Sequence, residues 1–455
     1  MPDYPMGLSM QFIPNSHLKQ SMCSESGVTS IDELFSDIPT SLRLDTLNLE
    51  KSLSQHQVED RLRSLGSQNT PCTAMPSFLG GGIKAHYIPP IVSAILSRSE
   101  FYTSYTPYQP EASQGFLQAM FEYQSIISEL TGMKVANASL YDGATALGEA
   151  ALMAQRITKR NTICIPQALS WEKKSILSNY LSGTQSTITE IRYHPTKGTM
   201  DRDDLEQKLS GDVSAVYVEN PNYFGLFEDE IQTINELVSN HHALLIVGVD
   251  PLSLGIVKPP AEYGADIVIG EGRCCGNAMD FGGSSLGIFA CTKAHVRQIP
   301  GRIIGMTTDT KGTPAFCMTM QTREQHIRRG KATSNICTNE GLNALAATVY
   351  LSWLGGEGLE QLGKQNITIA HGLMKKLTTI KGYTSPFTGT PFNEFVIKCP
   401  DPQALHTALL AKQIHGGLLL DHWFPALQNC MLFGATEMHS ETAMATLVDT
   451  AQEVC

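Results

Sequence analysis

Short apolar runs alternate with amphipathic stretches through the middle of this 455-residue chain. The apolar runs have the length and flanking residues of buried strands; they are Thr162–Ile165, Thr187–Ile191, Val213–Val218, Leu244–Val249, Ile267–Ile269 and Leu286–Ala290. Helical patterns lie between them at Ala144–Ile157, Trp171–Ser182, Arg202–Leu209 and Glu228–Asn240. Strands that alternate with helices are joined by right-handed crossovers, so the pattern predicts an α/β fold with a large, mostly parallel sheet covered on both faces.

The order of elements changes on either side of this region. Residues 1–75 are polar, and the short helices expected after Ser30 and from Ser54 to Leu65 carry too little apolar surface to form a core. Beyond residue 330 the expected elements are helices at Asn339–Leu354 and Leu359–Leu377, a strand at Glu394–Lys398, a helix at Pro402–Lys412 and a last helix from His439. We therefore predict an N-terminal helical arm (1–75), a large α/β domain (76–330) and a smaller C-terminal α+β domain (331–455).

Charge and cysteine usage narrow the class of function. The net charge of -11 argues against a protein that binds nucleic acid through its phosphates. No apolar run approaches the roughly 18 residues of a membrane span, and no secretory signal is visible, so we expect a cytoplasmic protein. The eleven cysteines contain no C-x-x-C pair and the histidines lack ligand spacing, so we expect free thiols and no metal site.

A tyrosine-rich loop is the first candidate site. Tyr105, Thr106, Tyr108 and Glu111 lie within a few residues of one another, between prolines that stiffen the chain. Their hydroxyls and carboxylate could hydrogen-bond a substrate carboxylate or a phosphate. A loop that only forms a protein interface is the alternative interpretation.

Two further positions suit a ligand at the edge of a parallel sheet. Asp142, Gly143 and Ala144 lead into a predicted helix, whose free N–H groups could bind an anion, although simple capping by Asp142 would explain the same residues. Asp250 follows an apolar run, at the strand end where open α/β sheets bind ligands, or it merely begins a turn with Pro251. Gly283–Gly287 reads G-x-S-x-G, but the expected strand follows it, which opposes a serine hydrolase.

Nine strings in order along the chain carry a family resemblance. They are FLGGG (78–82), TPYQPEASQG (106–115), FEYQ (121–124), NASLYDGATAL (137–147), DPLSLG (250–255), FGGSSLG (281–287), PGRIIG (300–305), MTMQTREQHIRRGKATSNICTN (318–339) and PFNEFV (391–396). Together they resemble the glycine cleavage system P-protein family, and within it the N-terminal half or first subunit. The resemblance implies the fold of type I pyridoxal-phosphate enzymes.

The resemblance also implies where the cofactor should bind, and one requirement is not met. In this fold a strand-end aspartate pairs with the pyridinium nitrogen, a part that Asp250 can play, and a lysine farther along forms the Schiff base. No lysine occurs between Lys258 and Lys293, and Arg273 cannot replace one because its guanidinium stays protonated. We therefore expect no covalently bound cofactor on this chain, only a remnant pocket with Asp142, Gly143, Ala144 and Asp250.

The family's split form supplies the missing part from a second, homologous subunit. That subunit 2 would carry pyridoxal phosphate in a heterodimer or a dimer of heterodimers. The implied reaction decarboxylates glycine, transfers the aminomethyl group to the lipoyl arm of H-protein and releases carbon dioxide. With no catalytic residue on this chain alone, the residues expected to reach across the interface are Tyr105, Thr106, Tyr108, Glu111, Thr338 and Asn339.

Two departures from the family pattern fall near the expected cofactor pocket. Ser170-Trp171 stands where members usually have His-Pro, and Gly270–Cys275 reads Gly-Glu-Gly-Arg-Cys-Cys where Gly-Asp-Gly-Gln is usual. A self-sufficient pyridoxal-phosphate enzyme is one alternative, which the missing lysine opposes. The other is a pseudoenzyme, a structural or regulatory partner that supports no glycine turnover.

Overall fold

A computed structural model of the chain describes residues 15–44 and 47–454. The described residues fall into two compact units, which meet along the chain between Thr70 and Pro71. The first unit contains α1 (Lys19–Glu25) and α2 (Gln55–Gly66). The helix expected from Ser54 to Leu65 is present, and Ser54 caps it: its hydroxyl accepts the Gln57 N–H while the Gln57 side chain accepts the Ser54 N–H. The helix expected after Ser30 is a 3-10 helix, Ile31–Phe35, and it has no side-chain cap.

The main sheet of the second unit has seven strands in the order β1-β7-β6-β5-β4-β2-β3. They are β1 (Val135–Ala136), β2 (Thr162–Pro166), β3 (Thr187–Ile191), β4 (Val213–Asn220), β5 (Leu244–Val249), β6 (Ile267–Glu271) and β7 (Gly287–Cys291). The neighbours from β3 to β6 are parallel, whereas β7 is antiparallel to both β6 and β1. The mostly parallel sheet expected from the sequence is confirmed.

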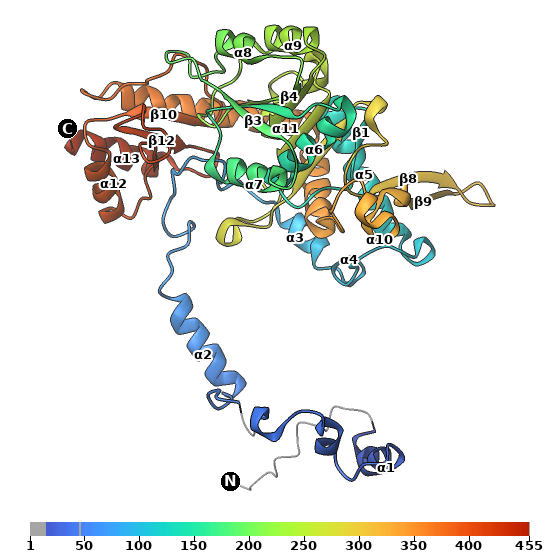
Figure 1. Ribbon diagram of the computed structural model, residues 1–455. Coiled ribbons are helices and arrows are strands. Elements are labelled where there is room, and N and C mark those ends of the chain that lie inside the picture. The colour runs from blue at the N-terminus through green and yellow to red at the C-terminus, as the bar shows by residue number, and fades with distance from the viewer. Residues whose placement is uncertain (1–14, 45–46, 455) are drawn as a thin grey trace. The chain divides into compact units, whose positions relative to one another are not determined.

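Helices cover both faces of this sheet (Figure 1). They are α5 (Gln114–Thr131), α6 (Gly143–Thr158), α7 (Trp171–Leu181), α8 (Arg202–Lys208) and α9 (Ile231–Asn240), with the short α3 (Pro90–Leu96) and α4 (Ser99–Tyr102) before them. Successive strand residues point to opposite faces. In β4, Ala215 and Tyr217 pack in the layer of α6 and α7, while Val216 and Val218 pack in the layer of α5, α8 and α9. Burial on both faces explains the continuous apolar runs in the sequence.

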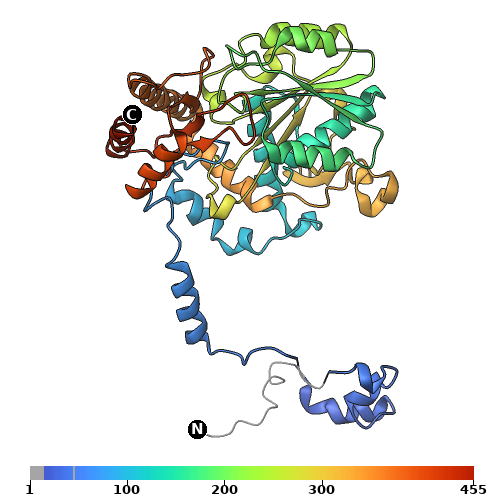
Figure 2. The ribbon, with the colours of Figure 1, turned by 60° about the vertical axis from the view of Figure 1, so that its left-hand side comes forward.

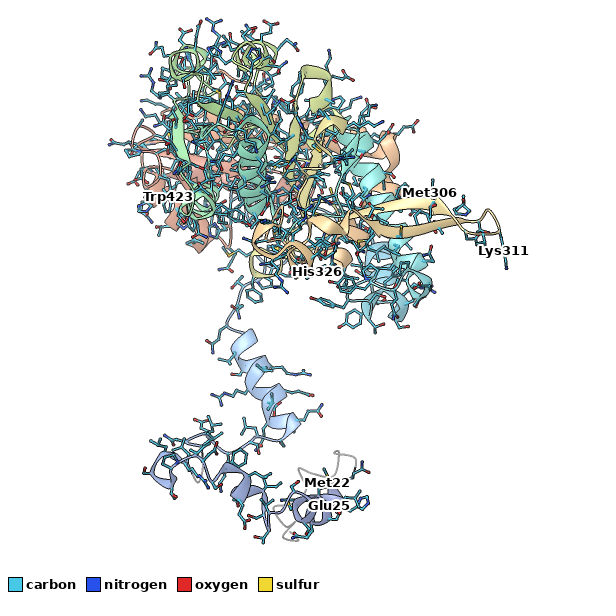
Figure 3. All side chains as sticks on the ribbon, turned by 45° about the vertical axis from the view of Figure 1, so that its right-hand side comes forward. Met22, Glu25, Met306, Lys311, His326 and Trp423 are labelled. Atoms are coloured by element: carbon cyan, nitrogen blue, oxygen red, sulfur yellow. The ribbon has the colours of Figure 1, made fainter. Side chains whose placement is uncertain are left out.

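A hairpin of β8 (Ile303–Thr308) and β9 (Pro314–Thr319) extends from the main sheet region, with Lys311 at its tip (Figure 3). The sequence analysis did not predict it. The exposed Met306 near its middle shows that one apolar side chain of the hairpin faces outward. The short helix α10 (Gln325–Arg328) follows.

The C-terminal part contains a second, antiparallel sheet in the order β10-β12-β11. Its elements are α11 (Gly341–Thr378), β10 (Glu394–Lys398), α12 (Pro402–Ala411), β11 (Leu418–Leu419), β12 (Cys430–Gly434) and α13 (Glu441–Glu453). Figure 2 shows the C-terminal helices, in red, gathered beside the main sheet. Trp423, labelled in Figure 3, stacks on Trp171 of α7 with ring centroids 5.3 Å apart, which ties this part to the main sheet.

One long helix, α11, joins the two sheet regions. The sequence predicts two helices here, and α11 does consist of two helical parts, separated by a break in helical geometry at Gly355. Ala346 near its start packs in the core of the main sheet, and Leu373 near its end packs in the core of the C-terminal sheet. Residues 71–455 therefore form one compact unit, and the domain boundary expected at residue 330 stays a prediction.

Candidate functional site

A cavity of about 300 Å³ lies where the parallel strands β4, β5 and β6 end. We call it the strand-end cavity. Asp142, Gly143, Ala144 and Asp250 all line it, so the structure brings together the residues expected to form a remnant pocket. Parallel strands place their carboxyl ends at one edge of a sheet, which is why residues far apart in the sequence meet here.

The start of α6 is the part of this cavity that could bind an anion, and the chain's own carboxylates fill it. The Gly143 N–H donates to Glu271 Oε2 at 3.1 Å, and the Thr145 N–H donates to Asp142 Oδ1 at 2.7 Å. Asp142 is thus the helix cap that the sequence suggested. Both carboxylates occupy donors that a phosphate would need.

Glu271 is held in place by two further backbone donors. Its Oε1 accepts the N–H groups of Leu286 at 2.9 Å and Arg273 at 3.1 Å. Burial raises the pKa of Glu271, although these hydrogen bonds and the Arg273 charge act in the opposite direction. A carboxylate bound by three backbone N–H groups is a built-in substitute for a bound anion.

Two lysines line the cavity, and both lie outside the stretch between Lys258 and Lys293 where a Schiff-base lysine would be expected. Lys84 Nζ lies 3.0 Å from Glu394 Oε1, and Lys173 Nζ is paired with Glu219. Burial alone would lower the pKa of Lys84, but the charges of Glu394 and Asp250 outweigh burial and raise that pKa above its usual value. The pKa of Lys173 is raised in the same way by Glu219. Both amines are therefore protonated at neutral pH and are not nucleophiles.

Asp250 and Cys274 complete this wall of the cavity. Asp250 Oδ1 accepts the Leu252 N–H at 2.9 Å, which fixes the carboxylate at the end of β5. A hydrogen bond with Cys275, together with burial, raises the pKa of the Cys274 thiol well above its usual value, so the thiol stays protonated.

A second polar cluster joins the two loops that the sequence singled out, and we call it the Tyr108 cluster. Its members are Tyr108, Arg302 and Asn339. Arg302 donates to the Tyr108 hydroxyl at 3.1 Å and to Asn339 Oδ1 at 3.5 Å, and its guanidinium carbon lies 5.3 Å from the Tyr108 ring centroid. His326, labelled in Figure 3, places its ring 6.4 Å from the same tyrosine.

The other expected interface residues are not members of this cluster. Tyr105 is 84% exposed and Glu111 is exposed, whereas Thr338 is half-buried. The hydroxyl of Thr106 is buried without a hydrogen-bond partner.

Our expectation that a helix opens at Asn339 is wrong. The helix α11 begins at Gly341, because the Asn339 side chain is engaged elsewhere and donates to the Ala138 carbonyl at 2.8 Å. The next residue, Glu340, donates its N–H to Ser139 Oγ at 3.0 Å. The segment before α11 thus lies on the loop that leads into α6, and this loop borders both the strand-end cavity and the Tyr108 cluster.

Across residues 15–44 and 47–454, no group of three or more His, Cys, Asp or Glu side chains is placed to hold a metal ion. Within the same described ranges, no helix is long and apolar enough to cross a membrane.

Comparison with known proteins identifies the family. The profile of the family described as "Glycine cleavage system P-protein" matches residues 10–450. The chain belongs to the glycine cleavage system P-protein family. "Probable glycine dehydrogenase (decarboxylating) subunit 1" of Thermococcus onnurineus (strain NA1) is 45% identical over 450 residues, covering 98% of this chain and 100% of that protein. The protein of the same name from Carboxydothermus hydrogenoformans is 44% identical over 431 residues, covering 94% and 96%.

Solved structures agree with this assignment. A glycine decarboxylase (P-protein) of the glycine cleavage system, in an inhibitor-bound form, superposes with a TM-score of 0.88 at 38% identity, covering 100% of both chains. A sphingosine-1-phosphate lyase from Burkholderia pseudomallei K96243 has a TM-score of 0.65 at 13% identity, covering 91% of this chain and 93% of that one. The second likeness concerns the fold alone, and it confirms the predicted fold of pyridoxal-phosphate enzymes.

P-proteins use pyridoxal phosphate, but the strand-end cavity of this chain does not fit it. The cofactor needs donors for its phosphate, an acid for its ring nitrogen and a free amine. Asp250 could serve the ring nitrogen. Glu271 accepts the Gly143 N–H at the start of α6, a donor that a phosphate bound there would need, and both Lys84 and Lys173 are protonated and ion-paired.

Sequence reasoning missed four charged residues that shape these sites. Lys84 and Lys173 lie outside the stretch between Lys258 and Lys293, where the resemblance places a Schiff-base lysine. Arg302 lies inside PGRIIG (300–305) and Glu271 inside the loop Gly270–Cys275, and the usable signal at both is a charged residue next to an apolar run, at Ile267–Glu271 and Arg302–Ile304. A charge at the end of a buried strand needs a partner, which marks it for attention.

Proposed function

We propose that this chain is the subunit of a glycine dehydrogenase (decarboxylating) that does not carry the cofactor. A homologous subunit 2 would hold pyridoxal phosphate in a heterodimer or a dimer of heterodimers, and the pair would decarboxylate glycine. The aminomethyl group would pass to the lipoyl arm of H-protein, with release of carbon dioxide. One observation supports the assignment of the cofactor to the partner subunit. The Glu271 carboxylate accepts three backbone N–H groups, among them the Gly143 N–H at the start of α6, which a cofactor phosphate would need.

Family membership supports the reaction, and the chemistry of the cavity supports the placement of the cofactor elsewhere. The cofactor, when bound to a protein, supplies the electron sink for decarboxylation. This chain would then act by binding and positioning. With no free amine in its cavity, it would depend on a partner for the chemical step.

The Tyr108 cluster supports the proposal that this chain contributes to an active site shared with its partner. Arg302 is only 3% exposed, and its Nε has no hydrogen-bond partner. It forms no ion pair with a carboxylate among the residues that the structure describes. A buried guanidinium without a counter-charge is costly, so a phosphate or carboxylate from outside the chain would stabilise it. Tyr105, Thr106, Glu111 and Thr338 would line the same contact.

The experiment is glycine–bicarbonate exchange with pyridoxal phosphate and H-protein, run on this chain alone and on its mixture with the candidate subunit 2. Activity only in the mixture is the expected result. Activity from this chain alone would contradict the argument from Glu271 and the two protonated lysines. If the mixture shows no exchange, while the same subunit 2 is active together with a different first subunit, the proposed reaction is contradicted.

A substitution within the same assay tests the Tyr108 cluster. We expect Arg302→Met to lower exchange by the mixture about tenfold or more, the usual loss when a charged hydrogen-bond donor is removed. Arg302→Lys should restore only part of it, because an ammonium lacks the planar fork of guanidinium donors. Arg297→Met is the control, since Arg297 is an exposed arginine a few residues away. Unchanged activity of Arg302→Met would remove this cluster from the shared site.

A further inference from the structure

The outer half of the β8–β9 hairpin stands clear of the rest of the second unit. Figure 3 shows Met306 along the hairpin and Lys311 at its tip, beyond the helices that cover the main sheet. The residues of β8 are buried up to Ile304 and exposed from Met306 onward. A hairpin of two strands with no third strand or helix against it is only marginally stable in water. The outer half of this hairpin therefore lacks the support that such a structure normally needs.

The hydrogen bonds of β8 show which of its backbone groups point away from β9. In an antiparallel pair, every second residue bonds to the partner strand and the residues between them point outward. Ile304 points outward, since its N–H donates to Gln124 Oε1 at 2.8 Å and its carbonyl accepts Gln124 Nε2 at 3.0 Å. Met306 and Thr308 follow at the same spacing and therefore point outward as well. The Asp309 N–H, one residue out of phase, donates across the hairpin at 2.8 Å, which agrees with this alternation.

The two edges of the hairpin differ in their protection. The Gln114 side chain covers the β9 edge, because it accepts the Phe316 N–H and donates to the Phe316 carbonyl, both at 2.8 Å. Farther out, the β9 edge carries Pro314, which has no N–H to offer to another strand. The β8 edge has neither form of protection beyond Ile304. Among the described residues, no hydrogen bond outside the hairpin involves the N–H or carbonyl of Met306 or Thr308.

The sequence of β8 contains nothing that opposes the addition of a strand. Proteins usually protect an exposed edge with a charged side chain, a proline or a bulge. From Ile303 to Thr308 the strand reads IIGMTT, without a charge or a proline, and its register with β9 has no bulge. Met306 is 60% exposed and lies opposite Phe316 in that register. The edge thus offers free backbone groups beside an exposed apolar side chain, as an added strand requires.

The base of the hairpin adjoins the Tyr108 cluster, which indicates the partner. Arg302 of that cluster directly precedes β8. His326, shortly after β9, places its ring 6.4 Å from that of Tyr108. Gln114, which covers the β9 edge, also donates to the Pro110 carbonyl of the tyrosine-rich loop at 2.7 Å. A chain that contacts the Tyr108 cluster therefore has the hairpin within reach.

We propose that the outer edge of β8 accepts an extended segment of the homologous subunit 2 as an added strand. The backbone groups of Met306 and Thr308 form hydrogen bonds with this segment, and one of its apolar side chains packs on Met306. The inference rests on the proposed function, which places subunit 2 at the Tyr108 cluster. It deepens that proposal, because it assigns a second contact surface, made of backbone groups, to the same partner.

Hydrogen–deuterium exchange at single amides, measured by mass spectrometry on this chain alone and on its mixture with subunit 2, tests the added strand. In the mixture we expect the amides of Met306 and Thr308 to exchange at least about tenfold more slowly than in this chain alone, because each becomes a donor within a sheet. Unchanged rates in a mixture that is active in glycine–bicarbonate exchange would overturn the added strand and leave the proposed function intact.

Two other outcomes of this experiment would also overturn the proposal. Protection of the same two amides in this chain alone would assign the β8 edge to a second copy of the chain. A mixture that forms no complex and has no activity would overturn the proposed function together with the added strand.

A matched pair of proline substitutions locates the contact. Thr308→Pro removes an outward N–H from the edge, whereas Thr310→Pro makes the same change in the turn of the hairpin. Thr310 is the second residue of a turn in which the Gly312 N–H donates to the Asp309 carbonyl at 3.0 Å, a position that suits proline. Sedimentation velocity should show that Thr308→Pro binds subunit 2 about tenfold or more weakly and that Thr310→Pro binds it with unaltered affinity. Equal affinities would overturn the proposal.

Met306→Lys decides the question if circular dichroism shows that Thr308→Pro does not fold. It keeps every backbone group and places a charge where the added strand would bury an apolar contact, so it should also weaken binding of subunit 2 about tenfold or more. Met22→Lys is the control, because Met22 is 61% exposed and belongs to the first unit. Equal affinities of these two variants for subunit 2 would overturn the proposal.

Discussion

At the scale of single residues, Glu228 shows how burial changes a carboxyl group. It is 6% exposed, and its two oxygens accept the Met200 N–H at 3.0 and 3.1 Å. Asn222 Nδ2 lies 3.5 Å from one of these oxygens. Burial raises the pKa of Glu228 from its ordinary 4.5 to about 8, and these hydrogen bonds offset it only in part. The neutral form is therefore the stable form inside the protein at neutral pH.

This raised pKa predicts a loss of stability with rising pH. A carboxyl whose pKa is higher in the folded state stabilises the protein fully below about pH 4.5, and that contribution is lost as the pH rises to about 8. We expect the free energy of unfolding of Glu228→Gln to vary less with pH over this window than that of the wild type. At pH 8 the variant should be the more stable of the two, by roughly 2–4 kcal/mol. Urea unfolding at several pH values measures it. Parallel profiles for variant and wild type would contradict the prediction.

Glu271 allows a second prediction at this scale. Removing its carboxylate in Glu271→Ala leaves three backbone donors unsatisfied, so the folded state should lose roughly 1–3 kcal/mol. The freed donors at the start of α6 should then bind inorganic phosphate. Phosphate should raise the midpoint of thermal unfolding of this variant and not of the wild type. Glu271→Gln is the control, because its amide still fills the position; an equal response of the two variants would refute the idea.

At the scale of elements, α11 depends on one glycine. Gly355 has φ 62° and ψ -177°, a backbone conformation that is almost exclusive to glycine. It breaks α11 within the part that packs on the main sheet, since Leu351 before it and Leu359 after it belong to the same core. The neighbouring Gly356 has no such constraint, and an added Cβ would meet nothing within 4 Å at either position.

The two adjacent glycines make a matched pair for mutagenesis. We expect Gly355→Ala to destabilise the protein by about 1–3 kcal/mol, because alanine is strained at that φ and ψ. Gly356→Ala should be neutral or stabilise by up to about 1 kcal/mol, since alanine favours a helix and restricts the unfolded chain. Urea unfolding compares them directly. Equal effects at both positions would show that the break does not require glycine.

At the scale of the whole molecule, the apolar core belongs to the second unit. Four clusters of buried apolar residues draw on positions between Phe78 and Ala451. The first unit contributes none of these core residues, and its described leucines, such as Leu42 and Leu49, are exposed. The stability of residues 71–455 should therefore be independent of residues 1–70.

Deleting residues 1–70 tests this independence. We expect the remaining chain to unfold cooperatively, with a midpoint within roughly 2 °C of the full-length chain, because no core side chain is removed. Circular dichroism during heating measures both proteins under the same conditions. Loss of the cooperative transition would show that the second unit needs the first in order to fold.

The sequence alone determined those features that depend on neighbouring residues. The strands β3, β5 and β10 have the predicted bounds. For the central strand β5 the reason is that a strand buried on both faces is a continuous apolar run. The caps at Ser54 and Asp142 were predictable, since a cap is a contact across three residues. The absence of lysine between Lys258 and Lys293 can also be read directly from the order of residues along the chain.

Only the tertiary structure decided which charged groups meet. Glu271 reaches back across 128 residues to Gly143, and Lys84 meets Glu394, with no local pattern to signal either contact. Arg302 likewise joins Tyr108 to Asn339. Spacing along the chain fixes periodic elements, because hydrogen bonds and side-chain faces repeat locally. The contents of a cavity depend instead on how those elements pack, and packing brings distant charges into a space where each must find a partner.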